Sequence, residues 1–506
     1  MVETRKHHCW ECRRRSLVCD FGVPGCKRCA ASGVDCPGYS KTPPLRIRWL
    51  APGQVNVRTV KDTPKNRQKD GKDEHRSASS ASSKDSPTPS EETRKLVIPR
   101  YEMKTEAHAQ VESFEYFNTC IFPIQAQVLS LGTNINVYKI PLPMFQIGLR
   151  APDHIRLGLI CSTLSHRMSQ TVNDPSSKAL AKTFYYYRGL MIRSLNEDLS
   201  VVKKRTSDIV LAGILTLLFA DIQQGISQSW RFHIEAVRRL LVVRGGMHSV
   251  AVSHGVLPMI LCFVYLAVTA DTSSPASDLL IETLPIEELY LLLGKYGGNG
   301  YAFQMCPTPL FVEIAKINHL RARASKAGII GDLDLQEEAC EILRRVYDFS
   351  PVEWTKANGP LEEAKIFFFN ILQKAVALYC MSSLQNLCLF PQGSPLSNSR
   401  YTERELLYGL LSQAFGPLSS LGLKGYLLWP TMVLGVEAVD GGAVMRFFVQ
   451  RSLIELSVSR GTYSPLAAKE VLESFWASDK TGWDACFDQP YMFTTVLTVN
   501  RGQMVK

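Results

Sequence analysis

Hydrophobic residues recur with helical spacing over most of the sequence beyond residue 98. In one clear case Trp230, Ile234 and Val237 fall on the same helix face, and Gly245 follows as the expected stop. The same periodicity predicts helices over 111–128, 154–172, 178–199, 209–222, 228–244, 333–347, 361–387 and 403–415. No stretch of alternating polar and apolar residues is long enough to predict a sheet. The pattern therefore predicts a large all-α body.

The longest apolar run covers residues 256–268 and has a proline near its start. Its 13 residues are fewer than the roughly 20 that a membrane-spanning helix needs, so a buried helix is predicted and no membrane partner. The first residues carry no apolar stretch of the secretory kind. We therefore expect a reducing compartment, where clustered cysteines bind metals before they form disulfides.

Residues 41–97 interrupt the hydrophobic pattern with proline, serine and charged side chains. A segment of this composition buries too little apolar surface to order itself. It predicts a disordered linker at 41–97, between an N-terminal domain at 1–40 and a helical domain at 98–506. Residues 41–97 carry no apolar heptads, so no zipper dimer is predicted and the oligomeric state stays open.

Charge is distributed unevenly along the chain. The net charge is +10, and residues 1–100 hold 21 basic and 11 acidic side chains. The remaining residues hold 36 of each sign, so the whole excess lies in the first fifth of the chain. This asymmetry has two readings, a polyanionic partner for the N-terminus or a solvated basic tail.

Six of the 14 cysteines lie within 28 residues and repeat one unit. The spacing is C-x2-C-x6-C, written twice with an offset of 17 residues. A C-x2-C pair converges on one tetrahedral Zn²⁺, which makes the whole set a candidate zinc site. The candidate ligands are Cys9, Cys12, Cys19, Cys26, Cys29 and Cys36.

The number of cysteines suggests how many metal ions they hold. Two tetrahedral Zn²⁺ ions need eight ligand positions, and six thiolates fill eight only if two of them bridge both metals. The repeat implies that the bridging thiolates occupy equivalent positions, such as Cys9 and Cys26. Because forty residues cannot build a hydrophobic core, the metals replace it. Each C-x2-C pair should then begin a short helix.

These residues resemble the fungal Zn(II)2Cys6 binuclear-cluster domain. The resemblance is carried by His8–Asp20, Pro24–Cys29 and Gly33–Tyr39. It implies two zinc ions bridged by the first and fourth cysteines, and a first helix whose end reads a CGG triplet in the major groove of double-stranded DNA. The residues it implies at the DNA are Arg13, Arg14, Arg15, Ser16, Lys27 and Arg28.

Within this resemblance Arg15 and Ser16 occupy the base-reading positions, but the family usually has lysine where Ser16 stands. This departure leaves the triplet open. It also keeps an alternative function open, that of a zinc-stapled co-regulator that binds a protein partner and has weak or no specific DNA binding.

The helical body resembles the fungal-specific transcription factor domain, through Glu115–Thr119 and Trp230–Gly246. Together the two resemblances imply a nuclear, sequence-specific DNA-binding factor that regulates RNA polymerase II transcription, with co-regulators as further partners. We find no phosphate-binding, nucleophile-elbow, zinc-protease or dinucleotide motif, so no enzyme is predicted.

The region 473–488 mixes aromatic and acidic side chains. This composition is found in activation segments. A last helix and turn that pack on the body would show the same residues, and this second interpretation fits the family better.

Overall fold

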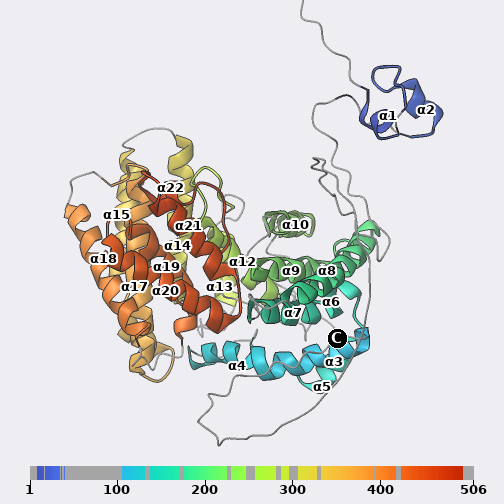
Figure 1. Cartoon of the computed structure of the whole chain (residues 1–506). Coiled ribbons are helices and arrows are strands. Elements are labelled where there is room, and N and C mark those ends of the chain that lie inside the picture. The colour runs from blue at the N-terminus through green and yellow to red at the C-terminus, as the bar shows by residue number, and fades with distance from the viewer. Residues whose placement is uncertain are drawn as a thin grey trace, which may run out of the picture. The chain divides into compact units, whose positions relative to one another are not determined.

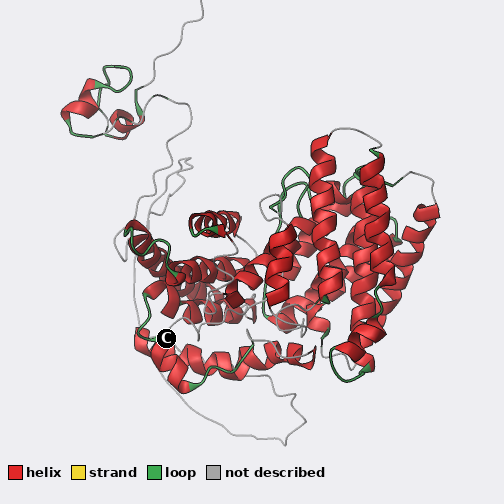
Figure 2. Cartoon of the chain, turned by 180° about the vertical axis from the view of Figure 1, so that it is seen from behind, coloured by secondary structure: helices red, strands yellow, loops and turns green. Residues whose placement is uncertain are grey.

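The computed structural model divides into two compact units, Met1–Val97 and Ile98–Lys506. All regular elements among its described residues are helices (Figures 1 and 2), which confirms the predicted fold class. The linker predicted at 41–97 lies outside the described residues. The described residues are 8–15, 17–34, 36, 39, 105–131, 137–170, 176–224, 230–246, 257–280, 286–295, 306–327, 332–390, 395–416 and 423–493.

The first unit contains two short helices, α1 (Trp10–Arg14) and α2 (Lys27–Ala31), which contact each other. Each begins directly after the first cysteine of a C-x2-C pair, as the spacing predicts. Among the described residues of this unit, the hydrophobic cluster consists of buried cysteines rather than aliphatic side chains, with Leu17 and Tyr39 packed against them. The sulfur atoms therefore occupy the place of a hydrophobic core.

The second unit begins with a group of helices arranged around α9, which we call the α9 bundle. Helix α9 contacts α6, α7, α8 and α10. The members of this bundle are α3 (Glu106–Tyr116), the π-helix η1 (Phe117–Ile121), α4 (Phe122–Gln125), the 3-10 helix η2 (Ala126–Leu131), α5 (Leu142–Gly148), α6 (Asp153–Arg156), α7 (Gly158–Gln170), α8 (Ser176–Ser200), α9 (Asp208–Gln224) and α10 (Trp230–Val243).

Helix α9 is central because apolar residues predominate on all its sides. Its residues from Val210 to Gln224 are all buried, including the polar ones near its C-terminal end. Gly213 allows close packing here, since a Cβ at this position would lie 2.4 Å from the ring of His154 on α6. The position therefore admits a larger residue only if the side chains of His154 and Leu195 shift.

The remaining helices pack around α17 and form the α17 bundle (from green through yellow to red in Figure 1). Helix α17 contacts α14, α15, α16, α18, α19 and α22, while α12 contacts both α9 and α14. The elements are α12 (Leu257–Thr272), α13 (Ile286–Lys295), α14 (Thr308–Ala327), α15 (Leu333–Asp348), α16 (Pro351–Ala357), α17 (Glu363–Gln385), α18 (Pro395–Ala414), the 3-10 helix η4 (Lys424–Tyr426), α19 (Leu428–Glu437), α20 (Gly442–Arg460), α21 (Ser464–Trp476) and α22 (Trp483–Cys486).

Two apolar helices show whether the apolar segments of the chain are buried in the protein. Among the described residues α17 is long and apolar enough to cross a bilayer, but 78% of its most apolar window is buried inside the protein. Helix α12 contains most of the apolar run at 256–268 and is buried from Met259 to Val264. Both are therefore explained as core helices, and the prediction for the apolar run is confirmed.

The predicted helices match α8, α9, α10, α15 and α17, with three differences elsewhere. Helix α18 begins at Pro395, before the predicted start at 403. The range 111–128 is four short elements rather than one helix, because a π-helical turn and Pro123 interrupt it. The range 154–172 is divided at Leu157 into α6 and α7. Gly245 has a φ of 92°, which agrees with its predicted role as a helix stop.

The aromatic and acidic segment near the C-terminus packs on the body. Trp483 is buried, its Nε1 donates to the carbonyl of Thr272 at 2.8 Å, and its ring lies 4.8 Å from that of Tyr379. Phe487 is buried beside it, at 5.3 Å between ring centroids. A packed helix and turn is therefore the correct interpretation of this segment.

A fully buried guanidinium, that of Arg321 on α14, joins this segment to the centre of the α17 bundle. Its Nη1 donates to the carbonyl of Asp271 and to the hydroxyl of Tyr379, at 2.9 and 3.0 Å. Its Nη2 donates to the carbonyl of Ser274 at 2.8 Å and to Oδ1 of Asp484 at 2.7 Å. Asp484 is thus the counterion of a buried charge.

Candidate metal centre

The two C-x2-C pairs adopt the same local geometry. Cys9 precedes α1, and its Sγ accepts a hydrogen bond from the backbone N–H of Cys12 at 3.4 Å. Cys26 precedes α2 and accepts from the N–H of Cys29 at 3.3 Å. Each helix therefore points its N-terminus at a sulfur atom, where the helix dipole stabilises negative charge on a thiolate. The C-x2-C-x6-C unit that occurs twice in the sequence therefore forms the same helix start twice in the structure.

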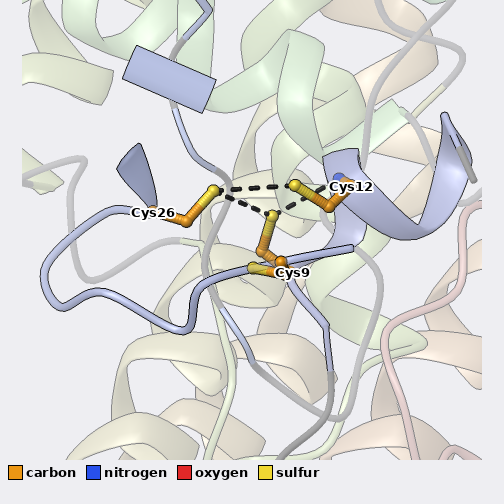
Figure 3. Close-up of side chains that lie close together, drawn as sticks. Cys9, Cys12 and Cys26 are labelled. Atoms are coloured by element: carbon orange, nitrogen blue, oxygen red, sulfur yellow. Dashed lines mark hydrogen bonds between the residues drawn. The ribbon is translucent and has the colours of Figure 1, made fainter. Parts of the chain in front are cut away.

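The six cysteines form two overlapping groups of four. One group contains Cys12 and Cys19, the other contains Cys29 and Cys36, and both contain Cys9 and Cys26. The four sulfur atoms of each group lie within 4.8 Å of one another. In Figure 3 the labelled thiols of Cys9, Cys12 and Cys26 point toward a common centre.

The sulfur spacing fits a tetrahedral zinc ion. With Zn–S bonds of about 2.3 Å, the sulfurs of a tetrahedron lie about 3.8 Å apart. The Sγ of Cys26 lies 3.6 Å from that of Cys9 and 3.7 Å from that of Cys12. The Sγ of Cys9 lies 3.8 Å from that of Cys29. Six thiols in two such groups suit two zinc ions, and no histidine is needed to complete either group.

Two residues to which the sequence assigned no individual role, Asp20 and Tyr39, organise the loop between the helices. The carboxylate of Asp20 accepts the backbone N–H groups of Lys27 and Arg28 at 3.0 and 3.3 Å. These hydrogen bonds, that of Lys27 first, hold the pKa of Asp20 below its usual value. Tyr39 donates its hydroxyl to the carbonyl of Gly22 at 2.8 Å. An acidic residue seven positions before a helix is not a recognisable capping signal, so Asp20 was not predictable from spacing.

The basic residues implied at the DNA lie on or beside the two helices. Arg13 is exposed on α1, with its guanidinium carbon 5.2 Å from the centroid of the Trp10 ring. Arg15, the exposed residue at the end of α1, donates its backbone N–H to the carbonyl of Glu11. The first two residues of α2, Lys27 and Arg28, are also exposed.

Two implied DNA contacts are described less completely. Arg14 is the last residue of α1, but its side chain lies outside the described part of the structure, and so does all of Ser16. The basic side chains that are described belong to both halves of the repeat. Neither half alone holds the whole set.

The residues that carry the resemblance in the helical unit have structural roles. Asn118 accepts the backbone N–H of Ile140 at 2.9 Å and donates to its carbonyl at 3.0 Å, across the π-helical turn. Nε2 of His233 lies 3.1 Å from Oδ2 of Asp221 on α9, which ties α10 to its neighbour. Asn118 and His233 therefore both connect segments that are separated in the sequence.

Comparison with known families assigns both units. Residues 7–45 match the family described as the fungal Zn(2)-Cys(6) binuclear cluster domain, whose members bind two zinc ions. Residues 112–493 match the family described as the fungal specific transcription factor domain. No solved structure matches the chain.

Curated relatives agree with this assignment. The chain is 36% identical to the phomenoic acid biosynthesis cluster-specific transcriptional regulator of Leptosphaeria maculans, over 99% of this chain and 91% of that protein. It is 41% identical to arginine metabolism regulation protein II of Saccharomyces cerevisiae, over 10% of this chain and 5% of that protein. The matched families are transcription factor families and not enzyme families, and the chain belongs to the fungal-specific transcription factor family of binuclear zinc cluster regulators.

Proposed function

We propose that this transcription regulator binds double-stranded DNA through its zinc cluster and reads a CGG-like triplet in the major groove. On this proposal it acts in the nucleus on genes transcribed by RNA polymerase II. The observation that carries it is the exposure of Arg13 and Arg15 on and just after a short helix whose other end is fixed by cysteines. A rigid metal scaffold that presents long donors from one helix end suits entry into a major groove.

The charge of the N-terminal segment supports a polyanionic partner. All the excess positive charge of the chain lies within residues 1–100. Each lysine or arginine that neutralises a phosphate releases a counterion, so affinity for any duplex should fall as salt rises. This contribution provides affinity but carries no sequence information.

Base recognition then depends on Arg15 in this proposal. A bidentate arginine on guanine contributes about 1–3 kcal/mol of discrimination per base pair. The hydroxyl of Ser16 is short and neutral, and it donates or accepts equally well, so it discriminates poorly. We therefore expect Arg15→Ala to flatten the preference for CGG duplexes over scrambled ones. Arg13→Ala should weaken both duplexes alike and reduce the salt slope by about one.

Fluorescence anisotropy of the full chain on CGG and scrambled duplexes, at two salt concentrations, measures these effects. Ser16→Lys provides the decisive comparison, because it restores the side chain usual in the family. Tighter CGG binding by this variant is expected. Unchanged or weaker binding would show that the end of α1 does not face the bases. Equal binding of both duplexes by the native chain would favour the zinc-stapled co-regulator instead.

We further propose that all six cysteines ligate zinc, with Cys9 and Cys26 as the bridging thiolates. The support is their shared membership of both four-cysteine groups. Cys9→Ala should therefore lose both zinc ions, because each metal loses a ligand. Cys36→Ala is the matched control, since the group of Cys9, Cys12, Cys19 and Cys26 stays complete, and one zinc per chain should remain. Zinc-to-protein ratios of the purified full-length variants test this, and equal losses would contradict the bridge.

Similarity to a relative also suggests which kind of genes the protein controls. The Leptosphaeria relative is named as a regulator specific to a biosynthesis cluster, and the similarity covers nearly the whole of this chain. We propose that this protein likewise controls a limited group of biosynthetic genes. Mapping of chromatin-bound sites, combined with transcript levels in a deletion strain, tests this. Binding at hundreds of dispersed promoters without a shared pathway would contradict it.

A further inference from the structure

The helical unit contains a cavity of about 400 Å³ between its two bundles. One wall is formed by the end of α9 and the start of α10, with Asp221 and Trp230. The opposite wall is formed by α21, α22 and the segment that follows α22. Cavities of this size, at the junction of packed bundles, are typical of small-molecule sites.

The lining combines aromatic rings with carboxylates. Glu470 and Ser474 lie on successive turns of one face of α21, and the adjacent Phe475 also lines the cavity. Trp230 and Phe475 are buried, whereas Glu470 and Ser474 are exposed at the rim. A molecule in this cavity would therefore contact rings in the interior and charged groups at the opening.

The charged residues that line the cavity determine whether it favours a positively or a negatively charged ligand. Its four charged residues are three carboxylates and one ammonium: Asp221, Glu470, Asp488 and Lys480. Asp221 is neutralised from behind, because both its oxygens accept from Arg188 at 2.6 and 2.7 Å. Glu470 and Asp488 at the rim still outnumber Lys480, so the opening is net negative.

We propose that this cavity binds a small organic cation, an ammonium carried on an aromatic or aliphatic body. The body would lie against the rings of Trp230 and Phe475, and the ammonium would face Glu470 and Asp488. Rings and carboxylates together favour a cation, because the face of an aromatic ring also attracts positive charge. Such a ligand would contact both bundles at once and tie the segment after α22 to α9 and α10. This goes beyond DNA binding and does not depend on it.

Three matched probes test the proposal on the full-length, zinc-loaded protein: phenethylamine, phenethyl alcohol and phenylacetate. They share one ring and differ in charge, and saturation-transfer NMR with titration gives their dissociation constants. The amine should bind at least threefold more tightly than the alcohol and the acid. Equal binding of all three, or tighter binding of the acid, would overturn the proposal.

Two variants locate the probe. Glu470→Gln should weaken the amine about threefold to fivefold, as expected for an exposed charge pair, and Glu470→Lys should reverse the preference toward the acid. Asp479→Asn is the control. This exposed carboxylate lies just beyond the end of α21 and is not among the residues that line the cavity. Ser474→Trp should block binding by filling the opening. If Glu470→Lys leaves the amine's affinity unchanged, the cavity is not its site.

Discussion

Two buried residues of α7, His166 and Arg167, contact the half-buried Tyr116 at the end of α3. The Tyr116 hydroxyl lies 3.0 Å from Nδ1 of His166, and the Arg167 guanidinium lies over the Tyr116 ring at 4.3 Å. Arg167 also pairs with Glu112 at 2.5 Å. Burial, and then the nearby charge of Arg167, lower the pKa of His166 to about 4. The ring is therefore neutral in the folded protein across the physiological range.

This pKa predicts acid sensitivity. The unfolded histidine has a pKa of about 6.5, so the unfolded chain takes up a proton first as the pH falls. The stability that His166 contributes is present above about pH 6.5 and is lost as the pH falls toward 4, by roughly 3 kcal/mol at most. Urea unfolding at pH 7.5 and 5 should show a smaller difference for His166→Gln than for the native chain. Equal pH differences for the native chain and His166→Gln would contradict the low pKa of His166.

For single helices, the sequence predicted the features that neighbouring residues determine, namely which face is buried and where a helix begins. The face of α10 formed by Trp230, Ile234 and Val237 is buried as its periodicity implies, and α1 and α2 begin at their C-x2-C pairs. The cap of α2 by Asp20 and the cavity between α9 and α21 were not predictable. They depend on how distant segments meet, which no spacing in the sequence records.

The segment around α22 provides a test at this scale. Trp483→Ala removes a buried ring and its hydrogen bond to Thr272, and should lower the free energy of unfolding by about 3–5 kcal/mol. Phe447→Ala is the control, because this ring on α20 is 66% exposed and its loss should change stability by no more than about 0.5 kcal/mol. Urea denaturation measures both. Similar values for the two variants would show that the segment contributes little to the fold, as an activation segment would.

For the whole molecule, the separate cores of the two units lead to a further prediction. The first unit is built around sulfur atoms and the second around one large hydrophobic cluster. We expect a fragment of residues 98–506 to fold without the zinc cluster and to melt within a few degrees of the body in the full chain. Circular dichroism and calorimetry compare the two. Limited proteolysis of the full chain should cut first between about residues 60 and 95, and early cutting within 210–244 would contradict this division.

The ion pair between Arg321 and Asp484 has a consequence for synthesis of the protein. The two residues are 163 positions apart, and a ribosome adds about 5–20 residues per second. For roughly 8–30 s the nascent chain therefore carries Arg321 without the carboxylate that balances it. The centre of the α17 bundle cannot close at low cost in that interval, since a buried charge without a partner is strongly destabilising. A premature stop codon before position 484 would make this state permanent. Such a truncated chain should accumulate to lower levels in the cell than the full-length protein, although it still contains all six cysteines of the zinc cluster.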